Sequence, residues 1–174
     1  MLFLQTLLSP VAVFADDKTN NAGGKRGDTN EKIRITAERL VSDSEAMWAE
    51  FIGNVEAVQG NDVIKADSLK IFYKSGSEKD KDETPGRESI KEIVATGNVT
   101  IHFDDKLAVS HRAVYTAENR VLVLSGGDSK VTSGRDSISG EKITLYRADG
   151  RIVVEGGSKK PVEAVLFPGG KGIK

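Results

Sequence analysis

The chain has 174 residues, of which 38% are hydrophobic, 29% charged and 6% aromatic, with 18 glycines, 4 prolines and no cysteine. One domain of this length can bury about 70% of its unfolded surface, and the missing cysteines exclude disulfides and thiolate metal sites. The net charge of −1 provides no basic footprint for nucleic acid.

The N-terminal residues 1–15 form an apolar run that ends at Ala15 and is followed by acidic and basic residues. This is typical of a signal peptide cleaved after Ala15. It lacks a basic beginning, so we expect the true start to lie upstream or the start codon to be misassigned. A membrane anchor is the alternative, although the run is shorter than the roughly 20 residues of a span. Residues 16–31, rich in Gly, Asn and Lys, are predicted to be disordered.

From residue 32 onward, one pattern occurs four times. A small residue stands sixteen positions before a glycine, because 53−37, 126−110 and 156−140 all equal 16. In the second copy 97−66 is 31, which becomes 16 without the 15-residue polar insertion 75–89. The small residues are Ala37, Ala66, Ser110 and Gly140, and the glycines are Gly53, Gly97, Gly126 and Gly156. Such a period is typical of stacked supersecondary units.

Each copy carries apolar residues two before its small residue, three after it, and four and two before its glycine. The last three copies carry another apolar residue five after the small residue. Apolar residues two positions apart lie on the same face of a strand. The spacing of three between the small residue and the next apolar residue would place the two on opposite faces, so it requires a bulge or bend between them. The glycines, two of them followed by Asn54 and Asn98, are predicted to form hairpin turns with positive φ. Each copy is therefore strand, bend, strand and turn, although residues 37–52 could be a helix on propensity alone.

Catalytic chemistry has little support in this sequence. His102 and His111 are the only histidines, and we expect both to be solvated strand residues because neither has a metal-ligand spacing. Asp104 and Asp105 are predicted to form a turn rather than a cation site. The charged run 78–83 reads as a solvated hairpin tip, and residues 125–128 lack the context of a phosphate loop or nucleophile elbow. We predict no enzyme, cofactor or metal site.

The repeats also carry a resemblance to a known family. It lies in Ile35-Thr36-Ala37-Glu38-Arg39-Leu40, in residues 51–60, 64–69, 93–99, 122–126 and 138–143, and in the C-terminal residues 156–168. Residues 33–168 thus resemble the LptA/OstA-like (organic-solvent-tolerance) family of lipopolysaccharide-transport proteins. Four copies in register with a signal peptide make the resemblance moderately specific, whereas the insertion is longer and more charged than the family pattern.

The resemblance implies an all-β, repeat-built, twisted open β-jellyroll with an apolar groove, over residues 32–168, followed by a flexible tail 169–174. It implies a periplasmic protein that binds the acyl chains of lipopolysaccharide (lipid A) and catalyses nothing. The implied partners are inner-membrane and outer-membrane components of the pathway with the same fold, and other copies of the chain joined head to tail through edge strands; nucleic acid is not among them.

Ile33 and Ile35 are assigned to the groove because they match the first strand of the family, and the other residues because strand alternation predicts that they face inward. Ordinary packing in the core is the alternative for each residue. The groove set is Ile33, Ile35, Phe51, Ile64, Leu69, Ile93, Ile101, Phe103, Leu124 and Ile143. The edge set is Ile33, Ile35, Val162, Val165 and Phe167. Trp48 has the opposite phase and is predicted to lie on the surface or at the groove mouth.

Three other protein classes remain open from the sequence. A membrane-anchored component of the same pathway would need an N-terminal span, and a structural β-solenoid or adhesin would have no groove. A polysaccharide-cleaving β-helix would need paired carboxylates on one face. Glu56, Asp67 and Glu141 are not predicted to converge in that way.

Overall fold

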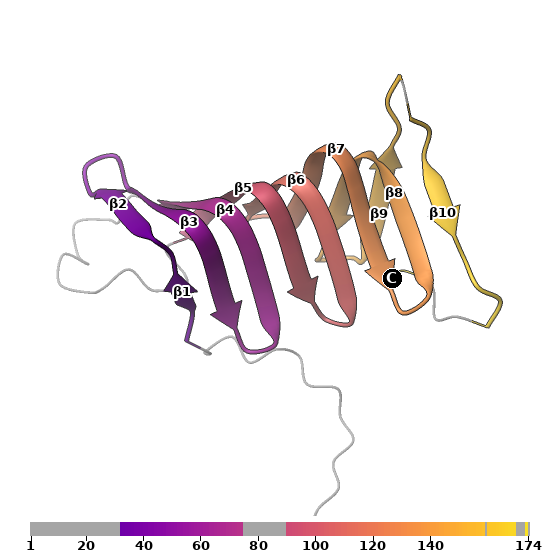
Figure 1. Ribbon diagram of the computed structural model, residues 1–174, viewed down its shortest axis with the longest axis horizontal. Coiled ribbons are helices and arrows are strands. Elements are labelled where there is room, and N and C mark those ends of the chain that lie inside the picture. Colours follow the sequence, from indigo (N-terminus) through magenta and orange to yellow (C-terminus); the bar gives the residue numbers. More distant parts are fainter. Residues whose placement is uncertain (1–31, 75–89, 159, 170–172, 174) are drawn as a thin grey trace, which may run out of the picture.

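The computed structural model describes residues 32–74, 90–158, 160–169 and 173. The segments predicted as signal peptide, disordered leader and charged insertion lie outside these residues. The described residues form ten strands in one antiparallel sheet (Figure 1). They include no helix that is long and apolar enough to cross a membrane. The predicted all-β class is confirmed.

Eight strands follow one another across the sheet in the order β1-β3-β4-β5-β6-β7-β8-β10, while β2 pairs with β3 and β9 pairs with β8. The strands are β1 (Arg34–Thr36), β2 (Arg39–Asp43), β3 (Trp48–Gln59), β4 (Asp62–Tyr73), β5 (Ile90–Phe103), β6 (Lys106–Thr116), β7 (Val121–Ser133), β8 (Asp136–Tyr146), β9 (Arg151–Glu155) and β10 (Glu163–Val165). The helix considered for residues 37–52 does not form. Pairing with β3 and β4 along this stretch outweighs the weak helix propensity of its side chains.

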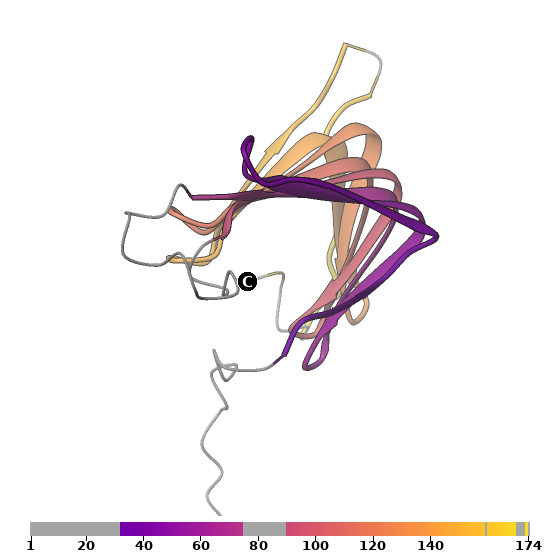
Figure 2. The same cartoon turned by 90° about the vertical axis from the view of Figure 1, so that its left-hand side faces the viewer.

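The sheet bends across its long strands, so that the strands from β3 to β8 each contribute to two layers that meet along one edge (Figure 2). We call the layer that contains β2 and β9 layer A, and the layer that contains β1 and β10 layer B. We call the bent edge the corner. The opposite side, where both layers end in turns, is the open side.

The corner forms where register shifts interrupt the pairing. Between β3 and β4, for example, the shift falls between Ile52 and Val55, so that the two residues Gly53 and Asn54 lie opposite the single residue Asp67 in a bulge. Both have positive φ, 83° and 45°, which glycine and asparagine tolerate best. The prediction of positive φ is confirmed for Gly53, Gly97 and Gly126 and is wrong for Gly156. The prediction that these three glycines form hairpin turns is wrong, because they lie inside β3, β5 and β7 and bend continuous strands, whereas Gly156 lies in the loop after β9.

The hairpins lie elsewhere, at the ends of the two layers. Layer B ends in two-residue turns, among them Asp104-Asp105, as predicted, and Gly134-Arg135. Layer A ends in four-residue turns at 44–47, 117–120 and 147–150. Turns at both ends of the bent strands leave the open side without a connecting strand in the described chain.

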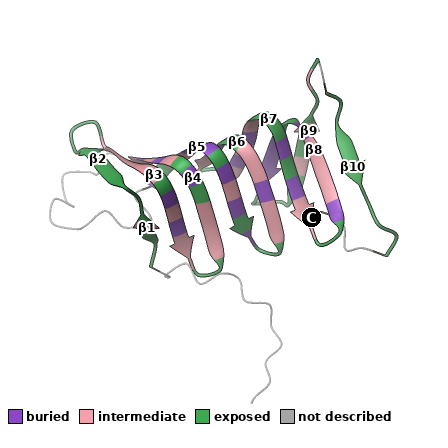
Figure 3. Ribbon diagram, in the orientation of Figure 1, coloured by how far each residue is buried: buried purple, intermediate pink, exposed green. Residues whose placement is uncertain are grey.

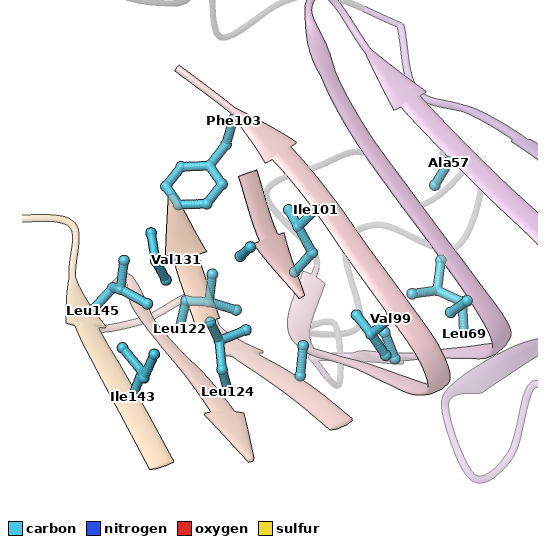
Figure 4. Close-up of a cluster of buried hydrophobic side chains, with 14 of the residues drawn as sticks. Ala57, Leu69, Val99, Ile101, Phe103, Leu122, Leu124, Val131, Ile143 and Leu145 are labelled. Atoms are coloured by element: carbon cyan, nitrogen blue, oxygen red, sulfur yellow. The ribbon is translucent and has the colours of Figure 1, made fainter. Parts of the chain in front are cut away.

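The apolar core lies between the layers and is richest in the middle of the sheet. Leu124, Val131 and Ile143 are fully buried there, and Leu69 and Val99 are nearly so. Figure 4 shows these side chains converging from several strands. Burial falls toward both ends, where β2 and β10 are exposed along their whole length (Figure 3). The core is therefore continuous along the sheet and only thinly covered at its ends.

Candidate functional site

The candidate site is the inner face, which we define as the apolar surface of the two layers that faces the space between them. Alternation within each strand places every second side chain there, and the corner bulge restores this phase after the bend. In β4, Ile64 and Ala66 face inward before the corner and Leu69 and Ile71 after it. The change from a spacing of two to a spacing of three residues, which was noted in the sequence, therefore corresponds to the bend of the strand at the corner.

The groove residues predicted from the sequence divide by burial. Leu69, Ile101, Phe103, Leu124 and Ile143 are buried in the core cluster. The half-buried members of the set pack against that cluster and retain accessible apolar surface; they are Ile35, Phe51, Ile64 and Ile93. Ile33 is 37% exposed and precedes the first residue of β1. Only the half-buried and exposed residues offer free surface to a ligand, and they lie in the N-terminal half of the sheet.

Sequence reasoning missed several residues of the inner face. Val55 and Val99 are each 2% exposed and belong to the core cluster. Val55 stands two positions after Gly53, and Val99 stands two positions after Gly97. If these glycines had been interpreted as bends within a strand, this shared spacing would have assigned both valines to the inner face. Ile173 was expected in a flexible tail but is half-buried against the same cluster.

A row of side-chain contacts, two of them hydrogen bonds, lies along the outer surface of the corner. The Asn98 side chain donates to Asp67 at 2.9 Å, and Asn54 donates to Glu38 in the equivalent place one repeat earlier. His111 lies against Gly126 in the third copy. Glu38, Asp67 and His111 each come directly after the small residue of their repeat. These contacts therefore stabilise the corner on its outer surface, and the inner face lies on the other side of the sheet.

On the open side, cations from both layers meet one aromatic ring. Lys106 Nζ lies 5.8 Å from the centre of the Phe103 ring, and the Arg147 guanidinium lies 5.5 Å from it. Lys106 begins β6 in layer B, whereas Arg147 follows β8 in layer A. Asp104 Oδ2 is 3.9 Å from Lys106 Nζ and 3.8 Å from an Arg147 nitrogen. This contact spans the open side between the layers.

Both ends of the sheet expose apolar residues of their outermost strands. At one end Leu40 and Val41 of β2 are exposed, and at the other end Val153 of β9 and Val165 of β10 are exposed. The predicted edge residues Val162 and Phe167 flank β10 and are exposed as well. The Phe167 amide donates to the buried Asp136 carboxylate at 2.9 Å, and its ring lies 3.9 Å from the Arg135 guanidinium.

The histidines and carboxylates considered as catalytic or metal-binding candidates are exposed or paired with polar neighbours. His102 and His111 are exposed, as expected, and Trp48 is half-buried with the Lys70 ammonium 3.7 Å from its ring centre. A hydrogen bond and the charge of Glu155 raise the pKa of Lys142 on layer A. Glu56 pairs with Lys65 at 2.9 Å, and Asp67 receives Asn98. No group of three or more potential metal ligands occurs among the described residues.

Comparison with known families matches this geometry. Residues 34–151 match the family described as LptA/(LptD N-terminal domain) LPS transport protein. The chain belongs to this family of lipopolysaccharide-transport proteins. The matched residues run from the first residue of β1 to the first residue of β9, so they contain both layers, the corner and the open side.

Two individual proteins are similar to this family member. An uncharacterized protein of Rhizobium meliloti (strain 1021) is 24% identical over 144 residues, which are 83% of this chain and 76% of that protein. The crystal structure of LptH from Pseudomonas aeruginosa, described as the LptA homologous periplasmic component of the lipopolysaccharide transport device, superposes with a TM-score of 0.67. It shares 16% identity and covers 82% of this chain and 99% of its own. The predicted open β-jellyroll is confirmed.

Proposed function

We propose that this protein is a periplasmic bridge component that holds lipopolysaccharide by its acyl chains and passes it along the inner face without chemical change. The observation that carries the proposal is the half-buried apolar row on that face, Ile35, Phe51, Ile64 and Ile93, in a sheet whose strands connect the two layers only at the corner. Family membership supports lipopolysaccharide as the cargo, and the description of LptH supports the periplasm.

The energetics favour acyl chains as the bound part. Each methylene moved from water to an apolar surface contributes about 0.8 kcal/mol, so several acyl chains are strongly retained by a continuous apolar face. The sugar part needs no burial and remains in water on the open side. Because the layers are not linked there by a described strand, a lipid could move along the face without threading through a closed ring.

The first test places a photo-crosslinking residue at Ile35 or Ile93 and incubates the protein with lipopolysaccharide. Crosslinks are expected at both positions and not at Arg34, the neighbour of Ile35 that has the opposite strand phase and is exposed. Adducts at Arg34 alone, or none at either inner position in a folded protein, would contradict the proposal and favour a structural solenoid without lipid.

A substitution provides the second test. Ile35→Glu is expected to fold, because Ile35 is only half-buried on a three-residue edge strand, and to lose lipid because a carboxylate among acyl chains must remain solvated. Arg34→Glu is the matched control on the same strand and should bind normally. Unchanged lipid binding by folded Ile35→Glu would remove this residue from the site.

We further propose that copies join head to tail through their end strands. β1 and β2 run antiparallel to β3, and β9 and β10 run antiparallel to β8. Because β3 to β8 alternate in direction, β10 runs opposite to β1. A second copy in the same orientation would therefore continue the antiparallel sheet in layer B, with β9 meeting β2 in layer A. Such a contact does not close on itself.

The exposed apolar residues at the two ends support this assembly. Pairing would cover Val165 and Leu40, which are 42% and 56% exposed, and would satisfy the unpaired edges that isolated sheets normally protect. The same edges would receive inner-membrane and outer-membrane components with the same fold. Sedimentation should show association that grows with concentration and is weakened by Val165→Glu. A strictly monomeric protein at high concentration would refute the assembly and leave the lipid proposal standing.

A further inference from the structure

The open side carries a cluster that the acyl-binding role does not use. We propose that Lys106 and Arg147 form an anion site there, and that it takes the phosphate group of an amphiphile whose acyl chains lie on the inner face. This inference rests on the proposed function, because it assigns a position to the headgroup of the same lipid. We call Lys106, Arg147, Asp104 and Phe103 the mouth cluster.

The mouth cluster is assembled from both layers by tertiary structure. Phe103 ends β5 and Lys106 begins β6 in layer B, on either side of the Asp104-Asp105 turn. Arg147 follows β8 in layer A, 44 and 41 positions further along the chain, since 147−103 = 44 and 147−106 = 41. An anion bound between the two cations would be held by one donor from each layer, at the point where the inner face opens to solvent.

The cations are only loosely engaged by the protein itself. The single carboxylate of Asp104 lies 3.9 Å from Lys106 Nζ and 3.8 Å from the Arg147 nitrogen, whereas charge-assisted hydrogen bonds are usually about 2.7–2.9 Å long. The Asp104 side chain is 62% exposed, so water screens both pairs. Asp105, in the same turn, makes no ion pair with any described residue. An incoming phosphate can thus replace Asp104 at little cost.

The surroundings favour an amphiphile over a free anion. Lys106 is 14% exposed at its side chain, and both cations lie within 6 Å of the Phe103 ring, which is itself 4% exposed. Figure 4 shows Phe103 close to Ile101 and Val131 within the apolar cluster. Apolar side chains from between the layers thus lie directly behind two positive charges. A lipid phosphate next to acyl chains has this order of groups, and the planar Arg147 fork suits phosphate oxygens.

The experiment compares two lipids that differ only in the headgroup. The affinity of the full chain is measured for lipid A and for the same lipid A after enzymatic removal of its phosphates. The wild-type protein should prefer the phosphorylated lipid by about tenfold, the effect of one or two partly exposed charge-assisted contacts. In Lys106→Gln/Arg147→Gln this preference should disappear, with binding of the dephosphorylated lipid unchanged.

Three controls make the result specific. Lys65→Gln/Lys142→Gln removes the same charge from exposed ion pairs on the outside of the sheet and should keep the preference. Asp104→Asn frees the cations and should strengthen binding of phosphorylated lipid about threefold, which no folding defect can imitate. Inorganic phosphate should compete only at millimolar concentration.

Several outcomes would overturn the inference. One is a full phosphate preference in Lys106→Gln/Arg147→Gln, and another is an equal loss in the Lys65→Gln/Lys142→Gln control. Competition by micromolar inorganic phosphate would identify a site for the free anion instead of a headgroup. If the dephosphorylated lipid fails to bind any variant, the acyl-binding proposal itself is wrong, whereas loss of the phosphate preference alone leaves it intact.

Discussion

The bend at the corner makes a quantitative prediction about two glycines with positive φ. Gly97 lies at the corner with φ +76°, and Gly134 lies in a hairpin turn with φ +59°. A Cβ at Gly97 would lie 2.7 Å from Asp67 Cγ and 2.8 Å from Asp67 Cβ, whereas a Cβ at Gly134 would meet nothing within 4 Å. Gly97→Ala and Gly134→Ala thus share the backbone strain but differ in steric contact.

The difference can be estimated from these contacts. An L-residue in the left-handed region costs roughly 1–2 kcal/mol, and this term applies to both variants. At Gly97 the Asp67 side chain must also move, which breaks its hydrogen bonds with Asn98, each worth about 0.5–1.5 kcal/mol. We expect Gly134→Ala to lose about 1 kcal/mol of unfolding free energy and Gly97→Ala about 3 kcal/mol.

Urea unfolding followed by circular dichroism measures both losses, with the slope of the transition checked for constancy. A double-mutant cycle with Asp67→Ala, which removes the carboxylate but keeps its Cβ, should show a coupling of about 1 kcal/mol between the two sites. Equal losses in the two glycine variants would refute the claim that the corner depends on the close approach of Asp67 to Gly97.

Two further predictions concern packing and charge. Leu124 is fully buried and Leu40 is 56% exposed, so Leu124→Ala should cost about 2–5 kcal/mol of stability and Leu40→Ala under about 0.5 kcal/mol; similar losses would contradict the assigned core. The hydrogen bond and charge of Lys160 lower the pKa of Asp128. The Asp128–Lys160 pair therefore stabilises the folded protein above the usual Asp pKa, and this contribution is lost as the pH falls through the lowered pKa. An NMR titration of Lys160→Met should show the Asp128 pKa returning toward its usual value. An unchanged Asp128 pKa in this variant would contradict the pairing.

The repeat could be read from the sequence because its determinants are local. Alternation in β4, from Ile64 and Ala66 to Leu69 and Ile71, records which side chains face the core, and a period of two can be counted without coordinates. The parity change at the small residue likewise predicted the bend. The glycines were misplaced because positive φ serves hairpin turns and bulges equally well, and only strand pairing separates the two.

Burial within the groove set could not be predicted in the same way. Phase assigns both Ile35 and Leu124 to the inner face, but one is half-buried and the other fully buried. The difference arises because Ile35 lies on an end strand with a neighbour on one side only, whereas Leu124 lies on β7 between β6 and β8. Position in the sheet is a property of the whole chain.

The sequence by itself determined the all-β class, the four repeats, the inward phase of the apolar residues and the family, because each depends on residues close together along the chain. Only the tertiary structure decided that the glycines bend continuous strands, which side is open and which residues meet across it. Lys106 and Arg147 face one carboxylate because two layers bring distant turns together. Contacts of this kind depend on the angle at the corner, which no local sequence pattern specifies.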